Sequence, residues 1–500
     1  MVGVAITFSR NGMNCERIKV EADLKRGLPA IVVTGMLSQE AKEAKERISP
    51  AMNNSGFDFP MKRITLNFSP AETLKLGTHY DLAMIVAILS AQFGVMFDEE
   101  TACFGEVSLS GDVSWVRGIL PLVMEAKRQG FKRILVPEKN LEELLCIEQD
   151  LIYPIRHLSQ LKGDLFSAKS ALTSSPKNAI CKPTEDYNQI KGQDALIEAF
   201  LISAVGNHHM LLIGPPGTGK TMCASRLSTI LPNLSSDELV DVNMISSIAR
   251  DSGVGSQWIT VRPFRTPHSS SSMRALIGGG PKLLPGEITL AHKGVLFLDE
   301  FLEFRSDSLQ ALRTVMERRE VYLSMRNGSS TYPADFLLIA ATNPCPCGYY
   351  QTEGVCRCSM KDVEKYRRKL HNPLTDRIDL QVKVNRVSYK NLGEYSKYSS
   401  EDMAQIVKKL RIKQSERYRN EEFSLNSEIP AHKIEEYCQL EIDAQKQLEC
   451  VMETKLLSVR SCHKILRIAR TIADLKGDES INCSILQRAI EYRVLDVDGE

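Results

Sequence analysis

The most informative segment of this chain is MLLIGPPGTGKT, residues 210–221. Its first four residues are apolar and predict a buried strand, and the helical spacing of CASRLSTIL after it predicts a helix. Glycines at the turn allow the backbone N–H groups to point inward at a phosphate, and the following helix presents its positive end to the same anion. The complete G-x-x-x-x-G-K-T pattern between strand and helix predicts a P-loop that binds ATP through Gly214, Pro215, Pro216, Gly217, Thr218, Gly219, Lys220 and Thr221.

Four roles in ATP hydrolysis follow from this pattern and from a second motif, GVLFLDE at residues 294–300. We expect Lys220 to reach the β- and γ-phosphates and Thr221 to ligate Mg²⁺. The apolar run of the second motif predicts another buried strand, which ends at Asp299. Asp299 is expected to orient Mg²⁺ through its water shell, and Glu300 to polarise the attacking water.

A third apolar strand, LLIAATNP at residues 337–344, ends in Asn343. Its amide could hydrogen-bond the attacking water or the γ-phosphate, or it could simply form a turn before Pro344. Arg377 in PLTDRIDL precedes a further strand, and Arg460 stands near the start of a helix. Local spacing assigns a role to neither arginine, because most arginines are solvated surface charges.

Length and composition limit the class of protein. A chain of 500 residues with 43% hydrophobic and 25% charged residues is typical of a globular protein of two to four domains. The formal net charge of +1 neither supports nor excludes nucleic acid as a partner. The N-terminus lacks the pattern of a signal peptide, and the most apolar stretch, residues 82–89, is too short to span a bilayer. Thirteen cysteines favour reduced thiols in a cytoplasmic protein over a disulfide framework. We expect no membrane partner.

The pattern along the chain predicts an α/β protein in four parts. Residues 1–165 combine strands and helices, including a helix that Ser38 can cap. A polar linker follows at 166–186. Strands alternate with helices over 187–385, the pattern of a parallel sheet covered on both faces, and residues 386–500 are helical.

Four cysteines directly follow Asn343: Cys345 and Cys347, then Cys356 and Cys358. Four thiolates suit a tetrahedral zinc ion, although C-x-C spacing is tighter than the usual zinc pattern. The turn-rich GYYQTEGV segment between the pairs could bring them together. The competing interpretation is four reduced thiols in a loop.

Two segments are locally basic, KYRRKL at 365–370 and KKLRIKQSERYR at 408–419. Each could neutralise DNA phosphates, but acidic neighbours such as Glu416 favour a solvated helix face. The polar RPFRTPHSS segment carries Arg262, Arg265 and His268 between the two ATPase motifs. A pore, internal packing or subunit contacts would all suit it.

Several long and unusual motifs resemble the YifB/ComM family of magnesium-chelatase-like AAA+ proteins. They cover almost the whole chain and include NSGFDFPMKRITLNFSPA (54–71), RPFRTPHSSSS (262–272), PGEITLAHKGVLFLDE (285–300), NPCPCGYY (343–350) and ILRIARTIADL (465–475). The resemblance implies an N-terminal domain similar to the Lon protease domain, a central AAA+ module and a helical C-terminal lid. Relatives of ComM are hexameric ring motors that move on DNA and drive branch migration during natural transformation.

The resemblance also implies roles for the two arginines. Arg377 is similar to the arginine finger that reaches a neighbour's ATP, and Arg460 to the lid arginine that senses nucleotide. A finger acts on another subunit, so a homo-oligomeric ring follows from it.

Peptidase activity is not expected from the Lon-like domain. The position of the catalytic serine corresponds to His79, with Thr78 beside it, and that of the lysine falls near Leu120. A leucine cannot deprotonate a nucleophile. Two functions therefore remain: a DNA-dependent helicase, and a chelatase-type motor that remodels a partner protein.

Overall fold

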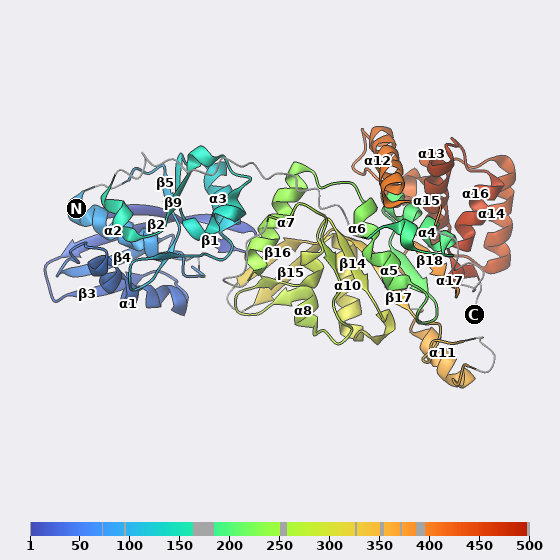
Figure 1. Ribbon diagram of the computed structural model, residues 1–500, viewed down its shortest axis with the longest axis horizontal. Coiled ribbons are helices and arrows are strands. Elements are labelled where there is room, and N and C mark those ends of the chain that lie inside the picture. Colours follow the sequence, from blue (N-terminus) through green and yellow to red (C-terminus); the bar gives the residue numbers. More distant parts are fainter. Residues whose placement is uncertain are drawn as a thin grey trace.

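The computed structural model describes residues 2–72, 74–94, 97–163, 185–250, 258–325, 328–350, 355–370, 373–386 and 396–497. Figure 1 shows three bodies along the longest axis, in sequence order from the N-terminus to the C-terminus. Most of the predicted 166–186 linker lies outside the described residues, and the predicted domain boundaries stay a prediction.

The N-terminal body is a seven-stranded mixed sheet, in the order β3-β4-β2-β1-β5-β8-β9. Helices α1 and α2 pack into one hydrophobic core and α3 into another. Ser38 caps α1 as predicted, since its hydroxyl accepts a hydrogen bond from the Ala41 amide. The bounds are β1 Val2–Asn11, β2 Asn14–Lys25, β3 Ala30–Thr34, α1 Gln39–Asn54, β4 Arg63–Ser69, α2 Asp81–Phe93, β5 Thr101–Cys103, α3 Ile119–Arg128, β8 Arg133–Pro137 and β9 Ile152–Ile155.

The central body contains a five-stranded sheet, in the order β11-β14-β17-β10-β18, in which every pair is parallel. Strand β10 therefore lies between β17 and β18. Its residues alternate between two cores, with Met210 facing α4 and the lid and Leu211 facing α10 and the β15–β16 hairpin. The bounds are α4 Asp194–Gly206, β10 Met210–Ile213, α5 Lys220–Ser225, α6 Leu227–Ile230, α7 Ser236–Ala249, β11 Phe264–Arg265, β14 Val295–Leu298, α10 Ser306–Arg318, β15 Glu320–Met325, β16 Gly328–Pro333, β17 Leu337–Thr342 and β18 Leu380–Lys383.

Burial explains why these sequences form strands of a parallel sheet. Every residue of β10, β14 and β17 is buried, because helices or hairpins cover both faces. Short apolar runs with no polar face are what such strands require. The predicted α/β class, with an N-terminal mixed body, a central parallel sheet and C-terminal helices, is confirmed.

The C-terminal body is helical and shares a hydrophobic core with one face of the central sheet. Helix α15 packs against α4 and α16, so the lid is anchored on the sheet rather than on a separate core. A smaller helix, α11, projects at the lower edge of Figure 1. The bounds are α11 Met360–Arg368, α12 Ser400–Arg417, α13 Ile434–Tyr437, α14 Ile442–Lys455, α15 Val459–Lys476, α16 Cys483–Glu491 and α17 Val494–Val497.

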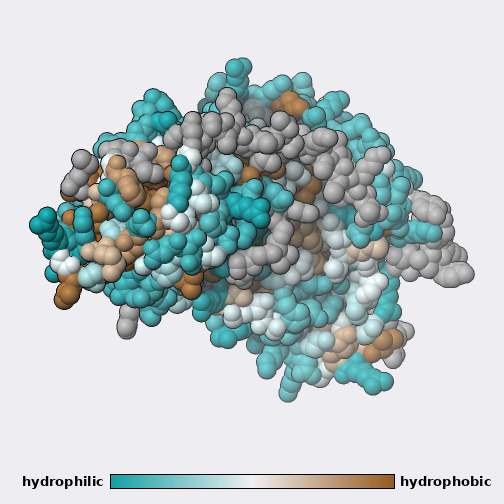
Figure 2. All heavy atoms as spheres, turned by 60° about the vertical axis from the view of Figure 1, so that its left-hand side comes forward, coloured by the Kyte–Doolittle hydropathy of each residue, from teal (hydrophilic) through white to brown (hydrophobic). Residues whose placement is uncertain are grey.

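The N-terminal and central bodies touch through α3 and α7. The Gly118 amide donates to the Ser247 carbonyl at 3.0 Å, and the Ser247 hydroxyl donates to Glu143 at 2.7 Å. On the face drawn in Figure 2, hydrophilic residues cover most of the coloured surface. None of the helices in the described ranges is long and apolar enough to cross a membrane.

Candidate nucleotide site and its neighbouring cavities

The P-loop joins β10 to α5 and takes the shape that its glycines allow. Gly217 and Gly219 have φ values of 76° and 83°, which an L side chain rarely adopts. The Lys220 ammonium donates to the carbonyls of Gly214 and Pro215, at 2.7 and 2.8 Å. Burial lowers the pKa of Lys220, and the Asp299 carboxylate opposes that shift. A buried cation thus stands inside a loop whose backbone can receive an anion.

The predicted magnesium residues meet at the end of β14. The Thr221 hydroxyl donates to the Asp299 carboxylate at 2.8 Å, although 78 positions separate the two residues in the sequence. The Glu300 amide donates to the other oxygen of Asp299 at 2.9 Å. Glu300 has a φ of 51°, an uncommon conformation for a residue with a side chain. Its exposed carboxylate accepts a hydrogen bond from Ser269, which the sequence reasoning did not identify.

These groups line one cavity with a volume of 530 Å³. Its walls include the P-loop, Asp299, Glu300 and Asn343. It lies at the carboxyl edge of the parallel sheet, because β10, β14 and β17 all end there. That edge is where open α/β sheets bind ligands. Lys220, Thr221, Asp299, Glu300 and Asn343, predicted from separate motifs, therefore line one site with the donor set for ATP and Mg²⁺.

Arg377 and Arg460 do not line this cavity. Both line a second cavity of 550 Å³, together with His209, Phe336 and Asp379. Those three residues precede β10, β17 and β18, so this cavity lies at the amino edge of the same sheet. From His209 to Gly214 the strand covers about 16 Å. The sheet therefore separates both arginines from the P-loop of their own chain.

Arg377 is held within the second cavity by one ion pair and one hydrogen bond to the backbone. Its guanidinium forms an ion pair with Glu317 of α10 and donates to the Pro373 carbonyl at 2.6 Å. Burial lowers the pKa of Arg377, and repulsion from Arg313 and Arg460 lowers it further. Arg313 is a third cation of this cluster, and sequence reasoning missed it, because its i,i+4 pair with Glu317 looks like an ordinary helix-surface pair.

The four predicted cysteines converge in space. Their sulfur atoms all lie within 4.8 Å of one another. The Cys345–Cys347 and Cys347–Cys356 sulfur distances are 3.4 and 3.6 Å. Four thiolates around zinc at about 2.3 Å would be about 3.8 Å apart, so the cluster fits a zinc ion closely. Hydrogen bonds from the Tyr349 and Arg357 amides lower the pKa of Cys347 to about 6.

The segment 344–350, which carries Cys345 and Cys347 and which we call the cysteine loop, packs directly on the nucleotide site. Gly348 has a φ of 83°, and a Cβ there would lie 2.6 Å from Pro216 Cδ and 3.6 Å from the Asn343 side chain. The loop therefore touches both the P-loop and the end of β17. Only a glycine at position 348 allows this close approach. The sequence alone did not reveal the contact.

Helix α11 follows the cysteine loop and carries the basic segment at 365–370. Lys361, Lys365 and Arg368 are exposed, whereas Tyr366 is buried and its hydroxyl lies 3.2 Å from that of Thr342. The Arg367 guanidinium stacks over the Tyr350 ring at 4.3 Å. One face of α11 thus anchors the cysteine loop, and the other presents positive charge to solvent.

The segment at 408–419 is different, because part of its charge is used inside the molecule. Arg411 of α12 donates to the Ala204 carbonyl at 2.6 and 2.8 Å, and Arg417 forms an ion pair with Asp474. The exposed lysines of this segment are Lys408, Lys409 and Lys413.

The RPFRTPHSS segment also packs internally. Arg262 donates to the Pro232 and Lys293 carbonyls, both at 2.6 Å, and Arg265 forms a bidentate pair with Glu287. The His268 ring lies 2.7 Å from the Ser270 hydroxyl. These contacts favour internal packing for both arginines.

In the N-terminal body, the residues at the Lon-type catalytic positions serve other purposes. His79 is buried, its Nε2 lies 2.8 Å from the Phe8 carbonyl, and burial lowers its pKa to about 4. Leu120 packs in the core beneath α3. The Thr78 hydroxyl donates to Glu106.

Family comparisons match three parts of the chain. Residues 186–392 match the description "Magnesium chelatase, subunit ChlI", residues 20–140 match "Subunit ChlI of Mg-chelatase", and residues 397–493 match "Magnesium chelatase, subunit ChlI C-terminal". Lon proteases of Rhizobium meliloti and Lachnoclostridium phytofermentans match at 25% and 26% identity over 172 and 157 residues.

Several relatives match this chain over nearly its whole length. The chain is 38% identical to YifB of Salmonella typhimurium over 501 residues, covering 99% of this chain and 98% of the relative. It is 35% identical to YifB of Escherichia coli, covering 99% and 97% of the two chains. The competence protein ComM of Haemophilus influenzae is 35% identical over 507 residues, covering 99% and 98%. With its P-loop, its paired acidic motif and these matches over nearly every residue, the chain belongs to the YifB/ComM family of magnesium-chelatase-like AAA+ ATPases.

Proposed function

We propose that this protein is an ATP-driven ring motor that acts on DNA, as a helicase that drives branch migration in recombination or natural transformation. The observation that carries the ring is the separation of the two cavities. Arg377 and Arg460 lie at the amino edge of the sheet, and the P-loop lies at its carboxyl edge. Cations that cannot reach their own site are available to complete a neighbour's.

Within one subunit, the chemistry is divided among the residues of the first cavity. Lys220 and the P-loop amides hold the phosphates, while Thr221 and Asp299 are placed to hold Mg²⁺, which neutralises developing charge when bound. The exposed Glu300 carboxylate polarises the attacking water, and Asn343 orients it. Arg377 of the next subunit then supplies positive charge to the γ-phosphate. Repetition of this interface by rotation gives a closed ring, for which we propose six subunits.

We propose that the cysteine cluster and α11 together form the element that binds DNA. Cys345, Cys347, Cys356 and Cys358 would hold one structural zinc ion, which would stiffen a loop that touches Pro216 and Asn343. The same loop leads into the exposed cations of α11. A conformational change at the nucleotide site can therefore be transmitted to a basic surface through a short segment that the zinc ion would hold rigid. Phosphate neutralisation by that surface supports DNA as the substrate.

A chelatase-type motor that remodels a partner protein is the alternative, and the family match favours it equally at the level of the ATPase module. ATP hydrolysis measured with and without single-stranded, forked and four-way DNA separates the two. A DNA motor hydrolyses ATP several times faster with one of these substrates. A rate unchanged by all three, with stimulation by a protein partner instead, would support the alternative.

A further inference from the structure

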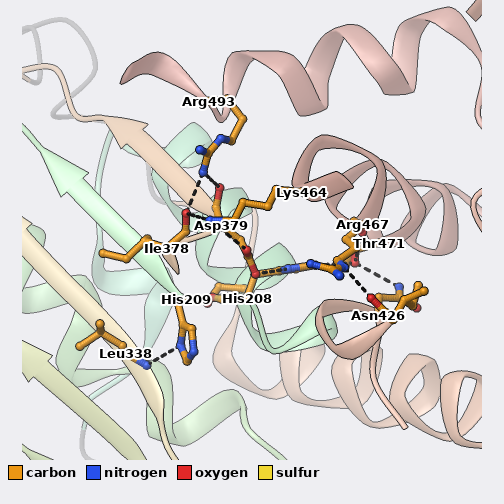
Figure 3. Close-up of polar contacts among 12 residues, drawn as sticks. His208, His209, Leu338, Ile378, Asp379, Asn426, Lys464, Arg467, Thr471 and Arg493 are labelled. Carbon is orange, nitrogen blue, oxygen red and sulfur yellow. Dashed lines mark hydrogen bonds and ion pairs between the residues drawn. The ribbon is translucent and has the colours of Figure 1, made fainter. Parts of the chain in front are cut away.

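A buried polar cluster joins the lid to the amino edge of the central sheet (Figure 3). We call it the lid junction and define it by His208, Asp379, Lys464, Thr471 and Arg493. Their side chains are all nearly inaccessible to solvent, with Lys464 5% and Arg493 2% exposed. Burying such charges is costly unless each is paired, so this concentration of buried polar groups calls for an explanation beyond packing.

Two lid cations hold the short segment that carries Arg377. Arg493 donates to the carbonyls of Ile378 and Asp379, at 2.7 and 2.9 Å. Lys464 donates to the carbonyls of Asp376 and Ile378. These carbonyls lie immediately before and after Arg377 in the chain. The backbone on both sides of the arginine is therefore fixed from the lid.

Lys464 also fixes Arg460, because both stand on α15 and four positions separate them. Residues four apart on a helix lie on the same face, one turn from each other. The Lys464 ammonium lies 4.0 Å from the Asp379 carboxylate. One buried ammonium thus connects the helix turn of Arg460 to the backbone of Arg377, and both arginines line the same cavity.

His208 extends the junction toward the nucleotide site. Its Nδ1 lies 3.2 Å from Asp379, and its Nε2 lies 2.8 Å from the Thr471 hydroxyl of α15. Strand β10 begins two residues later and leads into the P-loop. The next residue, His209, accepts a hydrogen bond from the Leu338 amide at 3.0 Å, at the start of the strand that ends at Asn343. The junction thus adjoins the amino end of β10, and the neighbouring His209 links it to the amino end of β17, the strand that precedes Asn343.

We propose that Lys464 and Arg493 are positioning residues that hold Arg377 and Arg460 as one rigid pair, aimed at the ATP of the neighbouring subunit. The inference rests on the proposed shared site. It adds that the pair acts as a unit and that its geometry is set by the lid of the chain that donates it. Misplacing such a group by about 1 Å can cost up to about a hundredfold in rate.

The test uses two full-length chains that complement each other. Arg377→Ala keeps its P-loop and lacks the finger, so it is the P-loop donor. Glu300→Gln binds ATP, hydrolyses it poorly and keeps both arginines, so it is the arginine donor. Their mixture should hydrolyse ATP faster than either alone. Failure of this mixture would overturn the shared site itself, independently of Lys464.

Lys464→Met is then placed in one donor at a time. In the arginine donor it should lower the complemented rate at least about tenfold, and in the P-loop donor it should change the rate less than about twofold. Arg493→Gln should show the same asymmetry, and Lys464→Arg in the arginine donor should restore most of the rate. The asymmetry is the decisive readout, because a defect in folding or assembly would impair both donors.

Arg470→Met is the matched control. Arg470 stands on α15 and is 3% exposed, but it donates to the carbonyls of Asp478 and Glu479 within the lid. It should affect both donors alike. Equal losses from Lys464→Met and Arg493→Gln in both donors, or none in either, with complementation intact, would overturn the positioning role.

Discussion

The two edges of the central sheet carry opposite kinds of site. At the carboxyl edge, the P-loop, Asp299 and Asn343 follow their strands directly, so each is recognisable in a short stretch of sequence. At the amino edge, Arg377 and Arg460 meet from segments 83 positions apart, held by buried lid contacts. One subunit therefore carries two separate cavities at opposite edges of its sheet, which the proposed ring would use as two halves of one shared site. Local motifs identify the residues of the first cavity, whereas the family resemblance suggests the two arginines and only the tertiary structure shows that they share a second cavity.

The largest effect should come from breaking the carboxyl-edge site itself. Lys220→Ala removes the buried ammonium that neutralises phosphate charge, and we expect ATP binding and hydrolysis both to fall below detection. Glu300→Gln should keep ATP affinity within about threefold while turnover falls at least about a hundredfold, because the carboxylate acts mainly on the water. Titration with a fluorescent ATP analogue and steady-state hydrolysis check both. Equal nucleotide affinity in the wild type and Lys220→Ala would contradict the P-loop assignment.

Arg377→Ala changes only the amino-edge cavity, so it tests whether that cavity contributes to ATP hydrolysis at the carboxyl edge of a neighbour. We expect nucleotide affinity to stay close to that of the wild type and turnover to fall about a thousandfold, since an arginine finger acts only on the transition state. ATP should also convert the wild type to a larger assembly, measured by light scattering. A fully active monomer, or Arg377→Ala with normal turnover, would mean that the two edges work independently.

Removing the cysteine cluster tests whether the loop beside the P-loop is needed for DNA binding or for ATP hydrolysis. Cys356→Ser with Cys358→Ser should release one zinc ion per chain, lower DNA stimulation about tenfold and leave basal hydrolysis within about twofold. Metal analysis of protein purified without a histidine tag checks the first part. Zinc-free wild type with freely titratable thiols would exclude the site. Loss of basal hydrolysis would instead make the loop a support for Asn343, through the Gly348 contact with Pro216.

The smallest expected effect concerns the exposed charge of α11. Lys365→Gln with Arg368→Gln should weaken DNA binding modestly and reduce the slope of log affinity against log salt concentration by about two, about one for each lost phosphate contact. Lys408→Gln with Lys409→Gln is the matched control on α12, whose arginines are used in lid contacts. Fluorescence anisotropy at several salt concentrations measures the slope. A larger change in slope from the α12 variant than from the α11 variant would indicate that α12, and not α11, binds DNA.

Much of the carboxyl edge was predictable because its information is local. A buried strand followed by glycines and Lys220 permits few other structures, and the same holds for the strand that ends in Asp299. The cysteine set could be identified from residue type, but only the folded structure shows that its four sulfur atoms lie close together. The contact of Gly348 with Pro216 was not predictable, since the two residues are distant in sequence and neither is unusual alone.

The amino-acid sequence alone was enough to predict the α/β class, the P-loop and its acidic partner motif, and the family. These depend on hydrophobic runs and on short motifs whose residues are neighbours in the chain. Tertiary structure decided which charges are available for function. The side chains of four arginines are used in internal contacts: Arg262, Arg265, Arg411 and Arg417. Arg377, although it pairs with Glu317, and Arg460 line a cavity beyond the reach of their own P-loop. The physical reason is that an arginine's role depends on its partners, and partners from distant segments are fixed only when the chain has folded.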